Sequence, residues 1–334
     1  MKIVQLLAMC LLTVGFVTPA STQDVLACLI TSTDNDPFAI KVKEGATAKA
    51  KELGLGLRSY AGKIGGDSES QIAAIESCIA DGAKGILLMP SNPSVIVSTM
   101  KKARDAGILV VALDDVLEPV DAADATIGID AFKIGRSLGM WAKGAESDIS
   151  SKNVIMFEDA NDDFAYSAMY GFIEGSGIDQ VPSVSCSCDC KKDECRKRCT
   201  PECKKTTSGL IIFGEFGQSI DIPQRLTPSP IWFATGPEAM RRAIDTRNGL
   251  GASGITISGY GGCPSVGEVR NGGLSATVLV FADQMAMDGI DAIATFAQTG
   301  ETPAKYTSSD YILVTDRPQP GVESIDSKTA MSRC

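Results

Sequence analysis

Four short apolar segments near the start of the chain, separated by amphipathic stretches, constrain the fold more than any other feature. They are rich in Ile, Leu and Val and alternate little with polar residues, which is typical of strands covered on both faces in a parallel sheet. We predict these strands at Val25–Ser32, Leu55–Tyr60, Ile86–Met89 and Ile108–Leu113. Strands that alternate with helices in this way predict a doubly wound α/β unit.

The stretches between these strands carry the signals of helices. The first helix is predicted to begin at Pro37, a residue that suits an initial helical turn, and to end before Gly54. Its apolar residues recur at three- and four-residue spacing. Asp67 is the predicted N-cap of the second helix, and the third is expected to begin near Pro93.

A second series of strands and helices follows from residue 153. Strands are predicted at residues 153–157, 210–213, 231–234, 254–258 and 311–315, and helices at residues 165–174, 238–248 and 283–298. The predicted fold class is therefore α/β, with two doubly wound, Rossmann-like lobes joined by a hinge. The first lobe is expected to comprise residues 24–128 and 283–309, and the second residues 129–282 and 310–334. The chain is expected to cross between the lobes near Ile129, Val280 and Ser309.

Composition excludes several classes of function. The formal net charge is −10, whereas nucleic-acid binding requires a clustered basic surface, so no nucleic-acid partner is expected. The chain contains no histidine, which excludes Ser-His-Asp and Cys-His catalysis and zinc bound by histidine. We therefore expect a binding protein that is not an enzyme and that needs no cofactor.

Residues 1–20 are predicted to be a signal peptide. Lys2 supplies a short positive start, an apolar stretch runs from Ile3 to Val17, and Thr18-Pro19-Ala20 offers a small-residue cleavage site. The mature protein is therefore expected to be periplasmic or secreted.

Polar residues follow the predicted strands where a ligand would bind, because ligands of open parallel sheets lie outside the carboxyl ends of the strands. The residues concerned are Asp34, Asn35, Asp36 and Phe38 after the first strand and Asp114 and Asp115 after the fourth. They predict a cleft for a small polar ligand. Alternatively, Asp34 and Asp36 only cap the following helix or form a turn. So many carboxylates disfavour an acidic ligand and suit a neutral polyol or an amine-bearing ligand.

Five short motifs spread along the chain carry a family resemblance. They are Thr33–Phe38 (TDNDPF), Gly82–Leu87 (GAKGIL), Asp121–Thr126 (DAADAT), Gly261–Pro264 (GGCP) and Gly321–Asp326 (GVESID). These motifs resemble the type I periplasmic sugar-binding proteins of ABC importers, and within them the group that binds fructose and ribose. The resemblance implies a monomer whose two lobes close around one sugar or polyol and are then recognised by an ABC permease or a receptor.

The resemblance also implies roles for individual residues. Phe38 corresponds to the aromatic ring that stacks on the sugar, Asp36 and Asp114 correspond to sugar-binding residues, and Asp115 adjoins them. Asp130 lies at the first crossing. The full set of candidate ligand-binding residues is Asp34, Asn35, Asp36, Phe38, Asp114, Asp115, Asp130, Thr235 and Tyr260.

The second lobe departs from the family pattern. The sugar-binding Arg of the family corresponds to Ala168, and its hinge Gln corresponds to Val280. Thr235 and Tyr260 stand where the family carries Asn and Asp, and can still donate hydrogen bonds. Because the charged contacts of this lobe are missing, either the ligand has changed or binding has been lost.

Six cysteines fall in a short basic segment that has no counterpart in the resembled family. They are Cys186, Cys188, Cys190, Cys195, Cys199 and Cys203. In an exported chain they are expected to form a small disulfide knot, the alternatives being a thiolate metal cluster and a gene-model or recombination artefact. Cys78 is expected to be a buried helix residue, and Cys28, Cys263 and Cys334 correspond to cysteines of the resembled group, with no pairing assigned.

Two functions are therefore open from the sequence. The first is an exported solute-binding protein that captures a small neutral sugar between its lobes for ABC-type import or sensing. The second is a degenerate secreted paralog that has lost sugar binding and uses its Cys-rich insert, residues 185–205, to bind a metal or a protein partner. The first lobe favours the former and the altered second lobe favours the latter.

Overall fold

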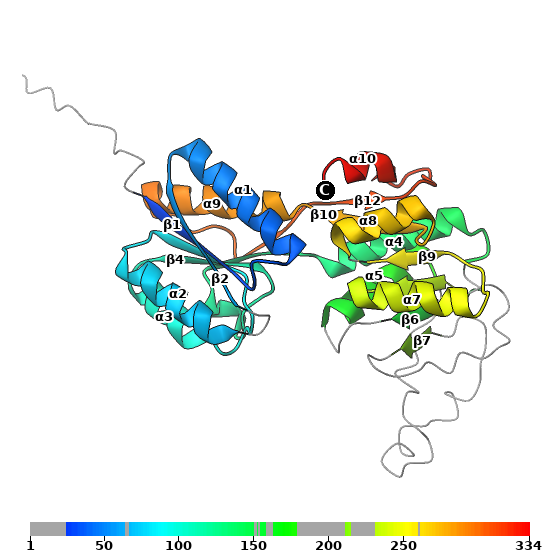
Figure 1. Cartoon of the computed structure of the whole chain (residues 1–334), viewed down its shortest axis with the longest axis horizontal. Coiled ribbons are helices and arrows are strands. Elements are labelled where there is room, and N and C mark those ends of the chain that lie inside the picture. The colour runs from blue at the N-terminus through cyan, green and yellow to red at the C-terminus, as the bar shows by residue number, and fades with distance from the viewer. Residues whose placement is uncertain are drawn as a thin grey trace, which may run out of the picture.

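The computed structural model describes residues 25–63, 67–149, 152, 154–157, 163–178, 211–214, 231–259 and 261–334. These residues form two α/β lobes, each built on its own sheet (Figure 1), so the predicted fold class is confirmed. The predicted signal peptide (residues 1–20), the Cys-rich insert (residues 185–205) and Tyr260 lie outside the described residues.

The first sheet has six strands in the order β11-β5-β4-β3-β1-β2, and every pair in it is parallel. Its strands are β1 (Leu26–Thr31), β2 (Gly56–Ala61), β3 (Gly85–Leu88), β4 (Leu109–Asp114), β5 (Ala125–Gly128) and β11 (Tyr306–Ser308). The observed bounds of β1 to β4 lie within one residue of the predicted ones. β1, β3 and β4 are covered on both faces as expected, whereas β2 is partly exposed because it is an edge strand.

Four helices cover the two faces of this sheet. α1 (Pro37–Leu53) and α9 (Ala282–Thr299) pack on one face, and α2 (Ser68–Ala80) and α3 (Val97–Asp105) pack on the other (Figure 1). α1 begins at Pro37, and its C-cap is Gly54, whose φ is 69°. The Asp67 side chain caps α2 by accepting from the Ser70 N–H. α3 begins four residues after Pro93, because the Asn92 side chain accepts from the next backbone N–H groups and holds a turn there. We call this sheet with its four helices the first lobe.

The second sheet has seven strands in the order β13-β12-β10-β9-β8-β6-β7. Its strands are β6 (Val154–Phe157), β7 (Ile211–Gly214), β8 (Ile231–Ala234), β9 (Thr256–Ser258), β10 (Ala276–Val280), β12 (Tyr311–Val314) and β13 (Ser324–Ile325). The β10–β12 pair is antiparallel, and the others are parallel.

Helices cover both faces of the second sheet as well. α4 (Ala131–Ala145) and α5 (Asp163–Ser176) pack on one face, and α7 (Pro237–Gly249) and α8 (Gly262–Asn271) pack on the other. The short C-terminal helix α10 (Ser327–Met331) lies beside α8, and a 3₁₀ turn spans Val120–Ala122 in the first lobe. We call this second sheet with its helices the second lobe. No described helix has the length and apolar character needed to cross a membrane.

Glycines let α4 and α5 come into backbone contact. A Cβ atom at Gly135 of α4 would overlap the carbonyl oxygen of Ala168 in α5, and one at Gly171 of α5 would overlap the Phe132 carbonyl oxygen. Ala168 is fully buried in this contact. Position 168 therefore lies at a close contact between the two helix backbones, and its side chain is enclosed in the core of the second lobe.

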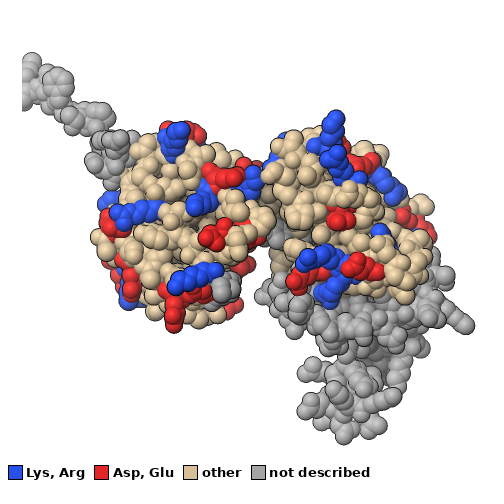
Figure 2. Space-filling model, viewed as in Figure 1, with Lys and Arg blue, Asp and Glu red and all other residues tan. Residues whose placement is uncertain are grey.

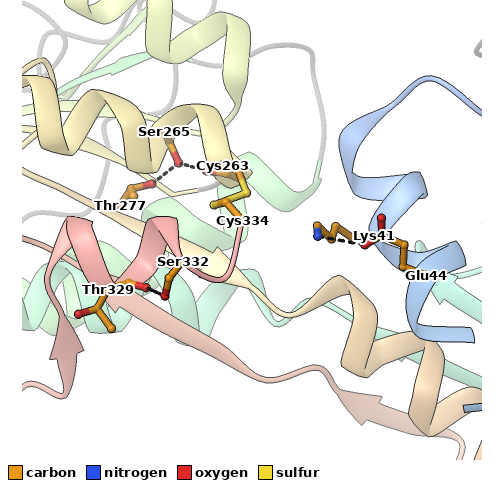
Figure 3. Close-up of a disulfide and its surroundings, with 9 residues drawn as sticks. Lys41, Glu44, Cys263, Ser265, Thr277, Thr329, Ser332 and Cys334 are labelled. Atoms are coloured by element: carbon orange, nitrogen blue, oxygen red, sulfur yellow. Dashed lines mark hydrogen bonds and ion pairs between the residues drawn. A yellow bond between two sulfur atoms is a disulfide. The ribbon is translucent and has the colours of Figure 1, made fainter. Parts of the chain in front are cut away.

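Two disulfides join segments that are far apart in the sequence. Cys28 of β1 is bonded to Cys78 of α2, and both residues are fully buried. Cys263, in the first turn of α8, is bonded to Cys334, the last residue of the chain (Figure 3). The expectation that Cys78 is a buried helix residue is confirmed. The pairings could not be assigned from the sequence because they depend on how the lobes fold.

Three segments connect the lobes, and they contact one another. They join β5 to α4, β10 to α9 and β11 to β12. The Ser309 N–H donates to the Gly128 carbonyl oxygen at 2.8 Å, and the Phe281 N–H donates to the Asp310 carbonyl oxygen at 3.2 Å. These hydrogen bonds hold the crossings together as one hinge.

Candidate ligand-binding cleft

A cavity of about 270 Å³ lies between the lobes at the hinge. Its lining comes from the start of α1, the start of α8, the crossing from β10 to α9, and the C-terminus. Figure 2 shows the two lobes meeting at a narrow waist at this place. Of the nine candidate residues, Asp36 and Phe38 line this cavity.

The start of α1 places these two side chains. Asp36 is the N-cap of α1, and its Oδ2 accepts from the Ala39 N–H at 3.1 Å, so the capping role considered from the sequence is confirmed for this residue. Capping occupies one carboxylate oxygen and leaves the other available. Phe38 is half-buried and packs against the main cores of both lobes. Its ring therefore lies where the two lobes meet.

Asp114, the last residue of β4, has an unusual backbone conformation. Its φ is 70°, and it is the one non-glycine residue with a positive φ in the described part of the chain. L-residues adopt this left-handed region at a cost, which Asp and Asn tolerate better than most. Strain of this kind concentrates at functional sites, where the surrounding structure maintains it.

The Asp114 carboxyl group lies in an acidic and partly buried environment. Burial raises the pKa of Asp114 to about 7, and the nearby charges of Asp115 and Asp36 contribute to the same effect. No described residue donates a hydrogen bond to this carboxyl group. Such a group gains from a ligand that donates hydrogen bonds to it.

Tyr306 joins this acidic group from the far end of the chain. It lies on β11, beside β5, and its hydroxyl is close to Gly128. Burial raises the pKa of Tyr306, and the charges of Asp130 and Asp114 add to the increase. The sequence analysis missed Tyr306, because the three-residue strand that carries it depends on pairing with a strand far away in the sequence. Its one local signal is the β-prone run Tyr-Thr-Ser after the helix that ends at Gly300.

Asp130 begins α4 directly after the first crossing. Its side chain caps α4 by accepting from the Lys133 N–H at 3.0 Å, and it also forms an ion pair with the Lys133 ammonium at 3.1 Å. Asp130 therefore has partners of its own, while its charge still acts on Tyr306.

Three further candidates, Asp34, Asn35 and Asp115, do not line the cavity between the lobes. Asp34 is exposed and lines a separate hollow of about 300 Å³ on the first lobe, together with Lys43 and Tyr60. The Asn35 side chain accepts from the Thr33 hydroxyl at 2.5 Å and its backbone N–H donates to the same hydroxyl, so this residue belongs to a local turn. Asp115 is exposed beside Asp114.

The second lobe contributes few polar groups. Thr235 follows β8 and is nearly buried, and its hydroxyl donates to the Phe157 carbonyl oxygen at 3.3 Å. Val280, at the hinge, is also nearly buried. Within the described residues, no group of three or more His, Cys, Asp or Glu side chains is arranged to hold a metal ion. The six clustered cysteines proposed as an alternative metal site lie outside those residues.

Two doubly wound lobes, joined by a three-segment hinge with a cavity between them, have the architecture of a two-lobed binding protein. The family model described as "Periplasmic binding protein domain" matches residues 26–194, just over half of the chain. The chain therefore belongs to the periplasmic binding protein domain family, in which its resemblance places it with the type I sugar-binding proteins.

Characterised relatives and solved structures agree with this assignment. The ribose import binding protein RbsB of Escherichia coli K12 is 25% identical over 297 residues, which cover 86% of this chain and 89% of that protein. The D-allose-binding periplasmic protein of the same organism is 28% identical over 117 residues, or 38% of its own length. The structure of a periplasmic ribose ABC transporter protein from Conexibacter woesei is 18% identical with a TM-score of 0.70, covering 88% of this chain and 93% of that one. These relatives are named as binding proteins rather than enzymes.

Proposed function

We propose that this chain is an exported solute-binding protein that captures a small neutral sugar or polyol between its lobes. The closed form is then recognised by an ABC permease or by a sensing receptor, with the chain acting as a monomer. The names of the relatives support a sugar, since two of them refer to ribose and D-allose. The two disulfides support an oxidising, extracytoplasmic location.

The observation that carries this proposal is the state of Asp114. A strained, partly buried carboxyl group, to which no residue in the described part of the chain donates a hydrogen bond, lies at the carboxyl end of a buried central strand. Sugar hydroxyls are such donors, and a carboxylate oxygen can accept from two neighbouring hydroxyls at once. Phe38 supplies the apolar ring face against which one side of a sugar packs.

The residues of the second lobe favour a ligand other than ribose. The position of the family's Arg is occupied by Ala168, which is fully buried and does not line the cavity between the lobes. Thr235 already donates its hydroxyl hydrogen to Phe157 and can only accept from a ligand. Ligand contacts would therefore come mainly from the first lobe, with its carboxylates and Phe38.

Thermal unfolding of the mature chain, residues 21–334, tests the proposal. The protein is heated with a panel of neutral pentoses, hexoses and polyols, each in large excess. A ligand at a hundred times its dissociation constant stabilises a fold by about 2.7 kcal/mol, which raises Tm by a few degrees. A selective shift with one sugar supports capture. If the protein is folded by circular dichroism and no sugar shifts its Tm, the degenerate secreted paralog becomes the better account.

A further inference from the structure

The cavity between the lobes is charged very differently on its two sides. From the first lobe it is lined by the carboxylates of Asp36 and Asp283 and by Lys41. From the second lobe, among the described residues, the lining is Pro, Gly, Cys and aliphatic side chains with one charged group, Arg333. Arg333 lies next to the last residue of the chain, outside every motif of the family resemblance.

We propose that Arg333 is the closing contact of the second lobe: when the lobes close, its guanidinium pairs with the carboxylates of Asp36 and Asp283. This proposal rests on the proposed capture of a ligand between the lobes, but its test does not need the ligand. Arg333 acts as a positioning residue, because it favours the closed cleft without being required to touch the sugar.

The C-terminus is anchored in a way that presents Arg333 to the cavity. Cys334 is bonded to Cys263 in the first turn of α8, and Ala330 of α10 is fully buried in the small core beside this disulfide. The Arg333 guanidinium lies over the ring of Phe281 at 5.3 Å from its centroid. Phe281 is part of the hinge, so the guanidinium is held beside the axis of closure.

The disulfide faces the first lobe across the cavity. Figure 3 shows Cys263 and Cys334 opposite Lys41 and Glu44 of α1. The Lys41 ammonium is paired with the Glu44 carboxylate at 3.0 Å, so this cation is already neutralised within its own helix. It therefore does not compete strongly with Arg333 for the carboxylates that line the cavity.

In this conformation the opposite charges are present but not joined. Within the described residues, neither Asp36, Asp283 nor Arg333 forms an ion pair. In an open, solvated cleft such charges are screened from one another. Closure removes that water and lowers the local dielectric constant, so the same charges attract one another more strongly. Anchoring by a disulfide reduces the entropy lost when the guanidinium is immobilised.

Small-angle X-ray scattering of the sugar-free mature chain tests the contact. Its radius of gyration is measured at about 0.5 M and about 0.02 M salt, a range over which the screening length grows several-fold. We expect the wild type to become more compact at low salt and Arg333→Gln to lose this response. Arg333→Lys keeps the positive charge and should therefore retain most of the salt response. Lys328→Gln is the matched control, since it removes the same charge from exposed α10 away from the cavity.

Two further variants make the test specific. Asp283→Asn should reduce the salt response of the radius of gyration. The double variant Arg333→Gln/Asp283→Asn should lose no more of this response than Arg333→Gln alone, because the effects of removing two partners of one contact do not add. Cys263→Ser/Cys334→Ser should also lose the response, because the tail is then no longer anchored. If wild type and Arg333→Gln respond equally to salt, or if Lys328→Gln has the same effect as Arg333→Gln, the proposal is wrong.

The salt test of Arg333 can succeed or fail independently of the sugar panel that tests the proposed function. If the panel identifies a sugar, Arg333→Gln should weaken its binding by about fivefold, the upper range for an exposed ion pair. If no sugar binds, the salt response of the sugar-free protein still decides whether Arg333 joins the lobes.

Discussion

Asp114 and Asp115 are neighbouring carboxyl groups at the end of a buried strand, and the charge of Asp115 adds to the effect of burial on Asp114. Together with Asp36 they leave Asp114 with a pKa of about 7. The side chain is therefore divided between its neutral and charged forms near neutral pH. In the neutral form it can donate as well as accept a hydrogen bond, which widens the range of hydroxyl arrangements that it can bind.

The pH dependence of stability should reveal this shifted group. Because the folded state binds the Asp114 proton more tightly than the unfolded state does, stability is greatest below the unfolded pKa and falls as the pH rises toward 7. Asp114→Asn lacks this loss, so at pH 8 it should be more stable than the wild type by about 2 kcal/mol, a figure discounted for partial exposure. Urea unfolding between pH 4 and 8 measures it.

The exposed Asp121→Asn variant is the control for Asp114→Asn, since both remove one negative charge from the first lobe. The stability of Asp121→Asn should change with pH in the same way as that of the wild type. If the stability of Asp114→Asn and that of the wild type change with pH in the same way, the pKa of the Asp114 carboxyl group is not raised.

Ligand binding should distinguish Asp114 from Asp34. Asp114→Ala should abolish the binding of any sugar found in the panel, because it removes a carboxyl group that accepts no hydrogen bond from any described residue and is therefore available to a ligand. Asp34→Ala should bind with unchanged affinity, because Asp34 lines a separate hollow. Isothermal titration calorimetry of both variants measures this, and undiminished affinity in Asp114→Ala would exclude the proposed site.

Packing between α4 and α5 should be highly sensitive to volume. Gly135→Ala adds a methyl group where it overlaps the Ala168 carbonyl oxygen, so we expect a loss of about 1–3 kcal/mol in the free energy of unfolding. Gly267→Ala is the matched control: Gly267 lies within α8 with open space around it, and Ala there should stabilise by about 0.5–1 kcal/mol. Denaturant unfolding compares the two. Equal effects would mean that the helices adjust at little cost.

The buried disulfide of the first lobe should contribute directly to stability. Cys28→Ala/Cys78→Ala removes a bridge between segments 50 residues apart and should cost about 2–5 kcal/mol. The midpoint of guanidinium unfolding, compared with that of the wild type under non-reducing conditions, measures this. An unchanged midpoint would show that the packing of β1 against α2 suffices without the bond.

Elements with strong local signals were predictable from the sequence. The strands β1 to β4 and the helix α1 carry continuous apolar runs, a proline at the start and a glycine at the end, and these signals do not depend on distant residues. α8 was missed because Gly262, Pro264 and Gly267 are poor helix formers. It is held by tertiary contacts, including a hydrogen bond of 2.9 Å between the Thr277 and Ser265 hydroxyls.

The site was predictable only where it lies close in sequence to a strong element. Asp36 and Phe38 adjoin α1 and line the cavity between the lobes, while Asp114 ends β4 and lies near enough to Asp36 for that charge to raise its pKa. Tyr306 and Arg333 reach the same region by long-range strand pairing and by a disulfide, neither of which leaves a local pattern. Sequence spacing also did not separate Asp34 from Asp36, although the turn before α1 directs them to different hollows.

The contact between α1 and α9 has a consequence for the order in which the chain folds. A Cβ atom at Gly45 would overlap the Asp283 carbonyl oxygen, so these two helices pack with their backbones in contact and together cover one face of the first sheet. The residues of α9 and β11 come after nearly all of the second lobe in the sequence. During synthesis, neither lobe can complete its core early, because the first needs α9 and the second needs Leu313 of β12. We therefore expect both lobes to fold late, only after the chain has been synthesised through β12.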